Sequence, residues 1–308
     1  MRTRRKKQSK TIYFIIFLLF LLTLFIFDRC SNGALSGKNK ADNNVKITNE
    51  LKNSGHSIVH FLNVGQGDCT LIETHDGKFA LIDASTQDSC DKIINYLESR
   101  NVKELEYVFF THPHEDHIGC GDEIISQFKV ANVIMTKVPE TTSSYQRLIK
   151  SIEKSIKKHG TKLLSPKNGD VFMLSDTCFE VISDGKGYED INNTSICLKM
   201  VLGESSFLFT GDAEKEVEDS ILKGGFDIDV DVFHCGHHGS STSNTSDFLD
   251  TVTPEYAIVS CGKDNDYGHP HKEVVSYFKS KNIPMLITHK NGDIVFSYNS
   301  EGVTLLSL

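Results

Sequence analysis

Apolar residues from position 57 onward alternate between short continuous runs and stretches with helical spacing. The runs Ile58–Leu62 and Leu105–Thr111 have the length of buried strands, and the turn pair Asp76-Gly77 separates two further runs, as in a hairpin. Asp88–Ser99 and Ile118–Phe128 place apolar residues three and four positions apart, which is typical of helices. Strands that alternate with helices predict an α/β fold.

The second half of the chain has the same organisation. Its apolar runs predict strands that could share a second sheet, and Glu214–Lys223 and Lys272–Ser280 predict helices that could cover that sheet. Two such sheets packed face to face, each with helices on its outer side, form a four-layer αββα sandwich. The predicted strands are Val171–Met173, Cys178–Ser183, Ser195–Val201, Ser206–Thr210, Val230–His234, Tyr256–Ser260, Met285–Thr288, Asp293–Tyr298 and Val303–Leu306.

The first apolar segment, Thr11–Phe27, has no charged residue over 17 positions. This length is close to the minimum of about 17 residues for a transmembrane helix. A cleavable signal peptide is the alternative, but its apolar part is usually only about 7–15 residues long and ends in small residues, whereas Asp28-Arg29-Cys30 follows here. We therefore predict one uncleaved N-terminal transmembrane helix at residues 11–27.

The charges around this segment predict its orientation. Residues 1–10 contain six basic residues and no acidic one, and such segments stay in the cytoplasm. We therefore expect the chain after Phe27 to lie outside the cell membrane, with residues 28–56 as a polar tether and residues 57–308 as one folded domain.

Composition restricts how this domain could bind a partner. The whole chain has a formal charge of −8, and without residues 1–10 it has 27 basic against 41 acidic residues, a net charge of −14. This balance excludes sequence-independent binding of nucleic acid through a broadly basic surface. A nucleic-acid substrate would have to be held locally. The densest basic stretch is the predicted helix Ser143–His159. A solvated face is the simpler interpretation of its charges, and a local strip that holds DNA is the alternative.

Eight cysteines are scattered along the chain without a CxxC pair. They lack the density of small disulfide-stabilised domains, so we expect most of them to be buried thiols. The residues before Cys30 are bulky or charged, which excludes a lipid-modified cysteine there.

Eight of the 13 histidines fall in three clusters, at positions 112–117, 234–238 and 269–271. The first cluster is an HxHxDH motif at His112–His117, which follows a predicted strand and precedes a helix. Sites in α/β folds form at such carboxyl ends of strands. Two imidazoles at i and i+2, with a carboxylate and a third imidazole at i+4 and i+5, can serve two adjacent metal ions. These ligands suit zinc, with manganese or iron as alternatives.

The HxHxDH motif resembles the signature of the metallo-β-lactamase superfamily, and three further motifs extend the resemblance. Leu81-Ile82-Asp83 resembles the family's first motif, Phe209-Thr210-Gly211-Asp212 the fourth, and Gly236-His237-His238-Gly239-Ser240 the last. The resemblance implies the four-layer αββα sandwich of that superfamily.

A narrower resemblance covers about residues 57–308. The motifs HFLNVGQGD, NNTS, HHGSSTS and YGHPH are similar to those of the extracellular hydrolase domain of bacterial competence DNA-internalisation proteins of the ComEC type. Three features depart from the pattern. The many-helix channel of those proteins has no counterpart here, Asn63 replaces an Asp, and the superfamily's third-motif histidine has no candidate.

The resemblance implies a ligand set for two divalent metal ions, with zinc expected first and manganese as an alternative. His112 and His114 would hold one ion, Asp116 and His117 the other, and Asp212 both. Asp116 and Asp212 would thereby also be catalytic. His237 is expected to complete the set in preference to His238, because the family's last ligand often follows glycine.

Other residues are expected to support these ligands or to contact substrate. Asp83 would steady the metal loop, and Asp68 would approach the metals from the Gly65–Asp68 turn. His269 and His271 would face the cleft as proton donors or phosphate contacts, the alternative being a plain helix start at Pro270. Hydrogen bonds to ligands or substrate are expected from Asn193, Ser195, His238 and Ser240.

The resemblance and the ligand set together imply a membrane-anchored extracellular hydrolase, most simply a nuclease or phosphodiesterase that cleaves DNA with a metal-activated hydroxide. Another cell-surface ester, a wall-polymer phosphodiester, or a lactone or lactam are alternative substrates, and a non-catalytic binding module is a third hypothesis. The Gly65–Asp68 turn lacks the lysine of a phosphate-binding P-loop, so we expect no nucleotide cofactor. The oligomeric state stays open.

Overall fold

The computed structural model describes residues 47–48, 50–138 and 140–306. The predicted transmembrane helix at 11–27, the basic segment 1–10 and most of the predicted tether lie outside these residues. Among the helices within the described ranges, none has the length and apolarity needed to cross a bilayer.

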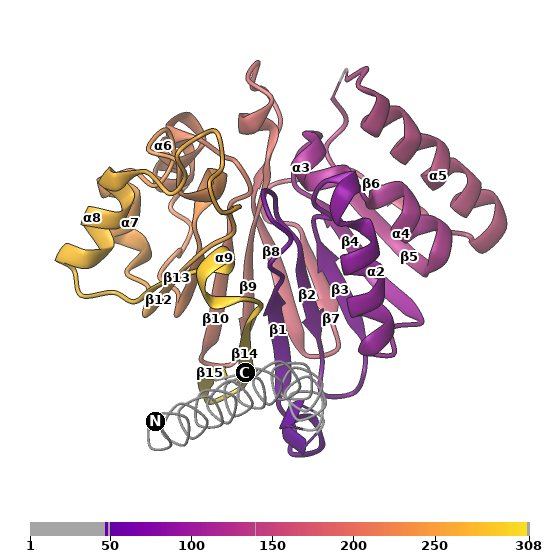
Figure 1. Cartoon of the computed structure of the whole chain (residues 1–308), viewed down its shortest axis with the longest axis horizontal. Coiled ribbons are helices and arrows are strands. Elements are labelled where there is room, and N and C mark those ends of the chain that lie inside the picture. Colours follow the sequence, from indigo (N-terminus) through magenta and orange to yellow (C-terminus); the bar gives the residue numbers. More distant parts are fainter. Residues whose placement is uncertain (1–46, 49, 139, 307–308) are drawn as a thin grey trace, which may run out of the picture. The chain divides into compact units, whose positions relative to one another are not determined.

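Two mixed sheets, of eight and seven strands, form the centre of the domain at residues 50–307 (Figure 1). The first has the order β15-β14-β1-β2-β3-β4-β5-β6 and the second β13-β12-β11-β10-β9-β8-β7. The strands of the first sheet are β1 (Ser57–Phe61), β2 (Thr70–Glu73), β3 (Phe79–Ile82), β4 (Glu104–Phe110), β5 (Lys129–Met135), β6 (Lys162–Leu164), β14 (Ile294–Asn299) and β15 (Gly302–Leu306). Those of the second are β7 (Val171–Leu174), β8 (Thr177–Asp184), β9 (Ile196–Leu202), β10 (Ser205–Phe209), β11 (Val232–His234), β12 (Tyr256–Val259) and β13 (Met285–Ile287).

Helices cover the outer face of each sheet, which confirms the predicted four layers. The helices that follow strands of the first sheet are α2 (Cys90–Ser99), α3 (Glu115–Ile118), α4 (Gly121–Gln127) and α5 (Ser143–His159). Those in the second half are α6 (Lys215–Gly224), α7 (Ser246–Val252), α8 (Lys272–Ser280) and α9 (Thr288–Asn291). Three short 3-10 turns lie at η1 (Gln87–Ser89), η2 (Asn192–Thr194) and η3 (Gly236–Gly239).

The apolar layer between the sheets is rich in phenylalanine. Phe61, Phe109, Phe179, Phe207 and Phe296 are each at most 1% exposed, and all belong to this layer. Burial of each such side chain contributes on the order of 1.5–3 kcal/mol. Two further apolar clusters lie between each sheet and its own helices, as a four-layer sandwich requires.

The sheets do not follow the two halves of the chain. Strands β14 and β15 return from the second half to the first sheet, where β14 pairs antiparallel with β1 and Ser57 lies opposite Tyr298. The expectation that each half forms its own sheet is therefore wrong for these last strands. Periodicity in the sequence identifies a strand but not its neighbour.

Strands β3 to β6 are parallel to one another, and so are β10 to β13. The loops that follow β3, β4, β10 and β11 therefore leave their sheets at carboxyl ends. These loops carry Asp83, the HxHxDH motif, Asp212 and the two adjacent histidines His237 and His238.

The predicted helix Ile118–Phe128 is interrupted, and this is a correction. Gly119 and Cys120 separate α3 from α4, because the chain turns tightly against the loop after β3. A Cβ atom on Gly119 would lie 2.6 Å from the backbone nitrogen of Gln87, so only glycine fits.

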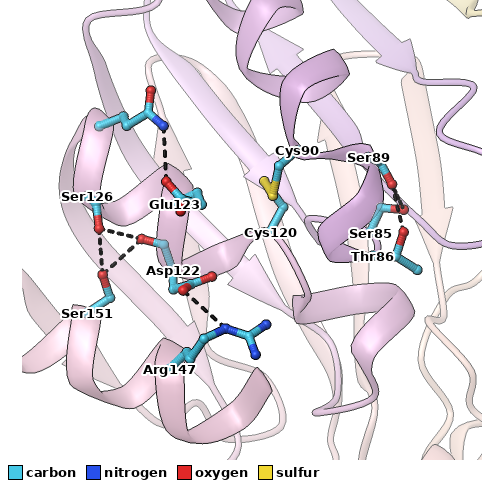
Figure 2. The surroundings of a disulfide bond; sticks show 11 residues. Ser85, Thr86, Ser89, Cys90, Cys120, Asp122, Glu123, Ser126, Arg147 and Ser151 are labelled. Carbon is cyan, nitrogen blue, oxygen red and sulfur yellow. Dashed lines mark hydrogen bonds and ion pairs between the residues drawn. A yellow bond between two sulfur atoms is a disulfide. The ribbon is translucent and has the colours of Figure 1, made fainter. Parts of the chain in front are cut away.

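A disulfide joins Cys90 at the start of α2 to Cys120 (Figure 2). This pair is a correction to the expectation of buried free thiols, because nothing in the spacing of the cysteines indicated it. The remaining described cysteines are free, and four of these five are buried, as expected: Cys69, Cys197, Cys235 and Cys261, with Cys178 half-buried. The disulfide links the start of α2 to the turn between α3 and α4, 30 residues further along the chain.

Candidate metal centre

The HxHxDH loop is held by Asp83, which follows β3. The carboxylate of Asp83 accepts hydrogen bonds from the backbone nitrogen of Thr111 at 2.8 Å and from its hydroxyl at 2.7 Å. The same carboxylate lies 2.8 Å from Nδ1 of His117, which leaves Nε2 of His117 directed at Asp212, 3.2 Å away. Asp83 therefore lies where it can position the loop and orient the imidazole of His117.

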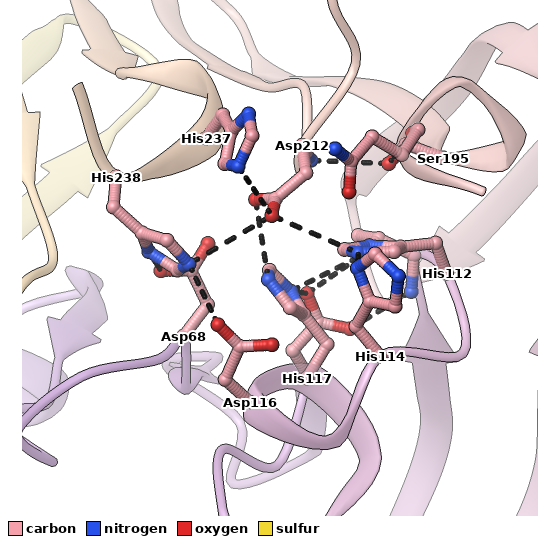
Figure 3. A network of polar contacts seen from close by, with 12 residues as sticks. Asp68, His112, His114, Asp116, His117, Ser195, Asp212, His237 and His238 are labelled. Carbon is pink, nitrogen blue, oxygen red and sulfur yellow. Dashed lines mark hydrogen bonds and ion pairs between the residues drawn. The ribbon is translucent and has the colours of Figure 1, made fainter. Parts of the chain in front are cut away.

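Two groups of potential metal ligands share Asp212 (Figure 3). The first consists of His112, His114 and Asp212, and the second of Asp68, His117, Asp212 and His238. Within each group the donor atoms lie within 4.8 Å of one another. A shared carboxylate between two sets of histidines is the arrangement expected for a pair of divalent cations.

His238, and not His237, belongs to the second group. Both rings lie at a similar distance from Asp212, 3.8 and 3.7 Å. The side chain of His238 is 2% exposed and also lies 3.1 Å from Asp116 and 3.3 Å from Asp68, whereas that of His237 is 21% exposed and lies 3.3 Å from Glu214. The preference for His237 is therefore not supported. Both histidines have positive φ angles, 50° and 53°, so the chain turns tightly here, and the identity of the preceding residue does not decide which ring points inward.

Asp68 enters the donor group itself. It was expected only to support the metals, but its Oδ1 lies 3.3 Å from Nδ1 of His238. The turn before it packs directly on the metal loop, since the backbone nitrogen of Asp68 donates to the carbonyl of Asp116 at 3.0 Å. A Cβ atom on Gly67 would lie 2.5 Å from that same carbonyl oxygen, which explains the glycine. Asp116 lies beside this group through its contact with His238.

The electrostatics of the centre fit bound cations. Asp68, Asp83 and Asp212 are buried, and Oδ1 of Asp68 and Oδ1 of Asp212 lack a hydrogen-bond partner among the described residues. Buried carboxylates of this kind are costly without compensating charge. Two divalent cations would neutralise them together with Asp116, so the donor set fits metal in both composition and charge.

The histidine pKa values respond to these carboxylates. Burial lowers the pKa of His117, but the charges of Asp212 and Asp83 outweigh burial and raise it well above the usual value. The pKa of His238 is also raised well above the usual value, because the charges of Asp212 and Asp68 outweigh the effect of burial. Burial and the neighbouring His117 lower the pKa of His112 well below normal. The centre thus strongly favours positive charge near the shared carboxylate.

The sequence matches the family model "Metallo-beta-lactamase superfamily" over residues 62–263, which is more than half of the chain. The chain belongs to this superfamily. Among solved structures, the metallo hydrolase Igni18 from Ignicoccus hospitalis has a TM-score of 0.51 at 15% identity and covers 79% of this chain and all of its own. This likeness supports the superfamily fold.

Matches to two curated proteins confirm the narrower resemblance. "ComE operon protein 3" of Bacillus subtilis is 29% identical over 80% of this chain, and "Competence protein ComA" of Neisseria gonorrhoeae is 37% identical over 39% of it. The matches cover 34% and 18% of those proteins, so this chain corresponds to about a third of their length or less.

Ser195, Asn193 and Ser240, which were expected to contact ligands or substrate, form hydrogen bonds with the backbone of the protein itself. Ser195 accepts a hydrogen bond from the backbone nitrogen of Asp212 at 3.0 Å and so holds the shared carboxylate. Asn193 accepts from the backbone nitrogen of Glu214 at 2.9 Å, and Ser240 from that of Thr242 at 3.2 Å. All three are buried, so they support the loops, and a direct substrate contact is not supported.

His269 and His271 have different surroundings. His269 borders an open cavity of about 300 Å³ above the donor groups. His271 is not among the lining residues, because its Nδ1 accepts from the backbone nitrogen of Ser241 at 2.9 Å and its Nε2 lies 3.1 Å from the carbonyl oxygen of Tyr267. The expected cleft role of His271 is thus not supported, whereas His269 is well placed. The lining residues are Gln66, His114, Glu115, Asp116, Asn192, Asp212, His237, His238, Tyr267 and His269.

The His237–His238 turn is held by two residues that the sequence motifs did not indicate, Asn244 and Glu218. The side chain of Asn244 donates to the carbonyl oxygens of Gly236 and Ser240 and accepts from the Gly236 nitrogen at 3.1 Å. Glu218 on α6 accepts in turn from the backbone nitrogen of Asn244. The signal that the sequence offers for this network is a glutamate one helical turn before Ile221, on the apolar side of the amphipathic helix α6.

Proposed function

We propose that this domain is a metal-dependent phosphodiesterase that acts on nucleic acid. The observation that carries the proposal is the pair of donor groups that share Asp212 at an open cavity. Two divalent cations, when bound, would lower the pKa of a water molecule and neutralise charge on phosphate oxygens. Superfamily membership supports metal-dependent hydrolysis, and the relatives named for competence support nucleic acid as the substrate.

The charges of the centre support a phosphodiester as the bond that is cleaved. With the histidines neutral, the carboxylates of Asp68, Asp83, Asp116 and Asp212 would repel an anionic substrate. Two divalent cations would balance them, and the site could then accept a phosphodiester. Cleavage adds water to phosphorus, breaks one ester bond and transfers a proton to the leaving oxygen.

His269 is the residue of this chain best placed to contact a phosphate oxygen. It borders the cavity, and its Nδ1 is buried without a hydrogen-bond partner among the described residues. Burial and the nearby His238 lower its pKa to about 4, so the ring is neutral near pH 7 and offers one N–H donor. A hydrogen bond from that donor would stabilise charge that develops on the phosphate.

We also propose that the chain is anchored in the cell membrane and that this domain lies outside the cell. The basic residues 1–10 and the apolar segment 11–27 support anchoring of the chain in the cell membrane with this domain outside. Protease added to intact cells would then remove the domain, and survival of the full chain until lysis would contradict the orientation.

The decisive experiment compares wild type with Asp212→Asn and with the control Asp247→Asn, an exposed residue on α7. Each protein is given Zn²⁺ or Mn²⁺ with bis-p-nitrophenyl phosphate, single-stranded DNA, double-stranded DNA and RNA. We expect wild type and the control to cleave, and Asp212→Asn to lose at least about a hundredfold in rate. Turnover of a lactam or lactone, with no diester cleaved under any metal, would overturn the proposal.

A further inference from the structure

The rim of the cavity carries one strongly exposed aromatic side chain, that of Tyr267. It is 65% exposed, the highest value among the exposed large apolar residues that the structure describes. It borders the same cavity as Asp212 and His269. An apolar ring in this position leaves favourable contact area unused until a ligand covers it.

The backbone around Tyr267 is fixed on both sides. The side chain of Asn265 accepts hydrogen bonds from the backbone nitrogens of Tyr267 and His269, at 3.2 and 3.0 Å, and donates to the carbonyl oxygens of Gly262 and His269. Nε2 of His271 donates to the carbonyl oxygen of Tyr267 at 3.1 Å. The ring is therefore presented by a rigid turn, and little entropy would be lost when a ligand stacks on it.

Tyr267 also connects the rim to the metal centre through ring contacts. Its ring is nearly parallel to that of His269, with an angle of 18° and centroids 5.5 Å apart. His269 in turn lies 6.0 Å from His238, measured between ring centroids. A planar group that stacks on Tyr267 would thus lie beside the position where a phosphate would meet the donor groups.

Stacking suits a nucleic acid at this surface better than charge attraction does. The domain is net acidic, so long basic tracks cannot supply most of the affinity. Stacking between bases and aromatic side chains does not depend on surface charge and tolerates any sequence. A base in a duplex is already stacked and paired, so only an unpaired base can use such a platform at no extra cost.

We propose that Tyr267 is the stacking platform for an unpaired nucleobase next to the phosphate that is cleaved, which makes single-stranded nucleic acid the preferred substrate class. This inference rests on the proposed function. His269 supports one face of the Tyr267 ring, and the base occupies the remaining exposed ring surface. The tyrosine hydroxyl has no part in this role.

Binding of single-stranded oligonucleotides that contain 2-aminopurine tests the proposal, because stacking quenches that fluorescence. The full chain is compared with Tyr267→Ala, Tyr267→Phe and the control Met173→Ala, a residue 48% exposed on the edge strand β7. We expect Tyr267→Ala to weaken binding about ten- to a hundredfold, and Tyr267→Phe and the control to bind as wild type does. An oligonucleotide with abasic sites should bind wild type and Tyr267→Ala equally.

Two outcomes would overturn the inference: equal binding of the base-containing oligonucleotide by wild type and Tyr267→Ala, or a loss in Tyr267→Phe as large as in Tyr267→Ala. The second outcome would assign the role to the hydroxyl. Because binding is read without turnover, failure of the proposed function is seen separately. A wild type that binds and quenches but cleaves no diester would contradict the phosphodiesterase alone, and one that cleaves DNA with Tyr267→Ala unimpaired would contradict the platform alone.

Discussion

Nδ1 of His117 lies 2.8 Å from Oδ2 of Asp83, and Nε2 of the same ring lies 3.2 Å from Oδ1 of Asp212. One imidazole thus joins the residue that steadies the metal loop to the carboxylate that both donor groups share. Because a carboxylate next to Nδ1 fixes the ring orientation, Asp83 controls the direction of the proposed metal-binding nitrogen.

Replacement of Asp83 tests this control. In Asp83→Asn, the shape and the tolerance for the positive φ of 57° are kept, but the charge beside His117 is lost. We expect the affinity of the second donor group for Zn²⁺ to fall about 10–100-fold. Isothermal titration of the stripped protein measures this, with the exposed Asp88→Asn as control. Unchanged affinity would show that the loop orients His117 without Asp83.

The two donor groups should bind metal unequally. The group with Asp68, His117, Asp212 and His238 has four ligands, and the other has three, one of them shared. We therefore predict two binding steps of different affinity when Zn²⁺ is added to the stripped protein. Two equally tight steps would argue against this partition of the ligands.

His237 and His238 offer a matched pair of variants, since both have positive φ angles that asparagine tolerates. We expect His238→Asn to lose the tighter step, because its ring lies among Asp68, Asp116 and Asp212. His237→Asn should keep both steps. Metal content after gel filtration provides the measurement, and the reverse result would restore His237 as the ligand.

A prediction away from the metal centre concerns pH. Glu73 is 1% exposed and pairs with Arg100 at 2.6 Å and Lys52 at 2.5 Å. Burial alone would raise its pKa, but contacts with His60, Arg100 and Lys52 outweigh burial and lower it to about 2. A folded-state pKa below the unfolded value adds stability above about pH 4.5, on the order of 3 kcal/mol, which is lost as the pH falls toward 2.

Glu73→Gln should therefore be less stable than wild type at pH 7, and the difference should shrink as the pH falls from about 4.5 to 2. Urea unfolding at several pH values measures the difference. The control is Glu98→Gln, an exposed glutamate on α2, which should follow wild type throughout. A gap between wild type and Glu73→Gln that stays constant with pH would contradict the assignment of the low pKa to Glu73.

The Cys90–Cys120 disulfide closes a loop of 30 residues, and removal of such a link costs about 3–4 kcal/mol by the loop-entropy relation. The double variant Cys90→Ala, Cys120→Ala should lose this much free energy of unfolding in guanidinium. Cys178→Ala, which removes a free and half-buried thiol, is the control. If a reducing agent and the double variant both leave stability unchanged, the disulfide does not contribute.

Local signals in the sequence were sufficient for most of the fold and for the core of the site. Alternating runs predicted the strands, and the spacing in HxHxDH brought His112, His114 and His117 together because all three lie within six residues, where β4 is followed by the short helix α3. What the sequence could not predict depends on contacts between distant segments. Examples are the close approach of Gly119 to Gln87, the pairing of β14 with β1, and the direction of His238.

The position of the basic helix α5 relative to the metal centre could not be predicted from the sequence either. The sequence marked Lys154, Lys157 and Lys158 as a dense basic stretch on α5. Because α5 runs from the carboxyl end of β5 to the start of the parallel strand β6, its last turns lie at the sheet edge opposite the metal loop. These lysines are thus far from the site, and only the topology of the sheet reveals this.

The ligands of the second donor group come from both sheets. Asp68 and His117 follow strands of the first sheet, and Asp212 and His238 follow strands of the second. A bound cation would therefore have to be released before the two sheets could separate. Metal should make the opening of both sheets one cooperative event, so that amide hydrogens in β4 and in β10 exchange with solvent at a common, slower rate.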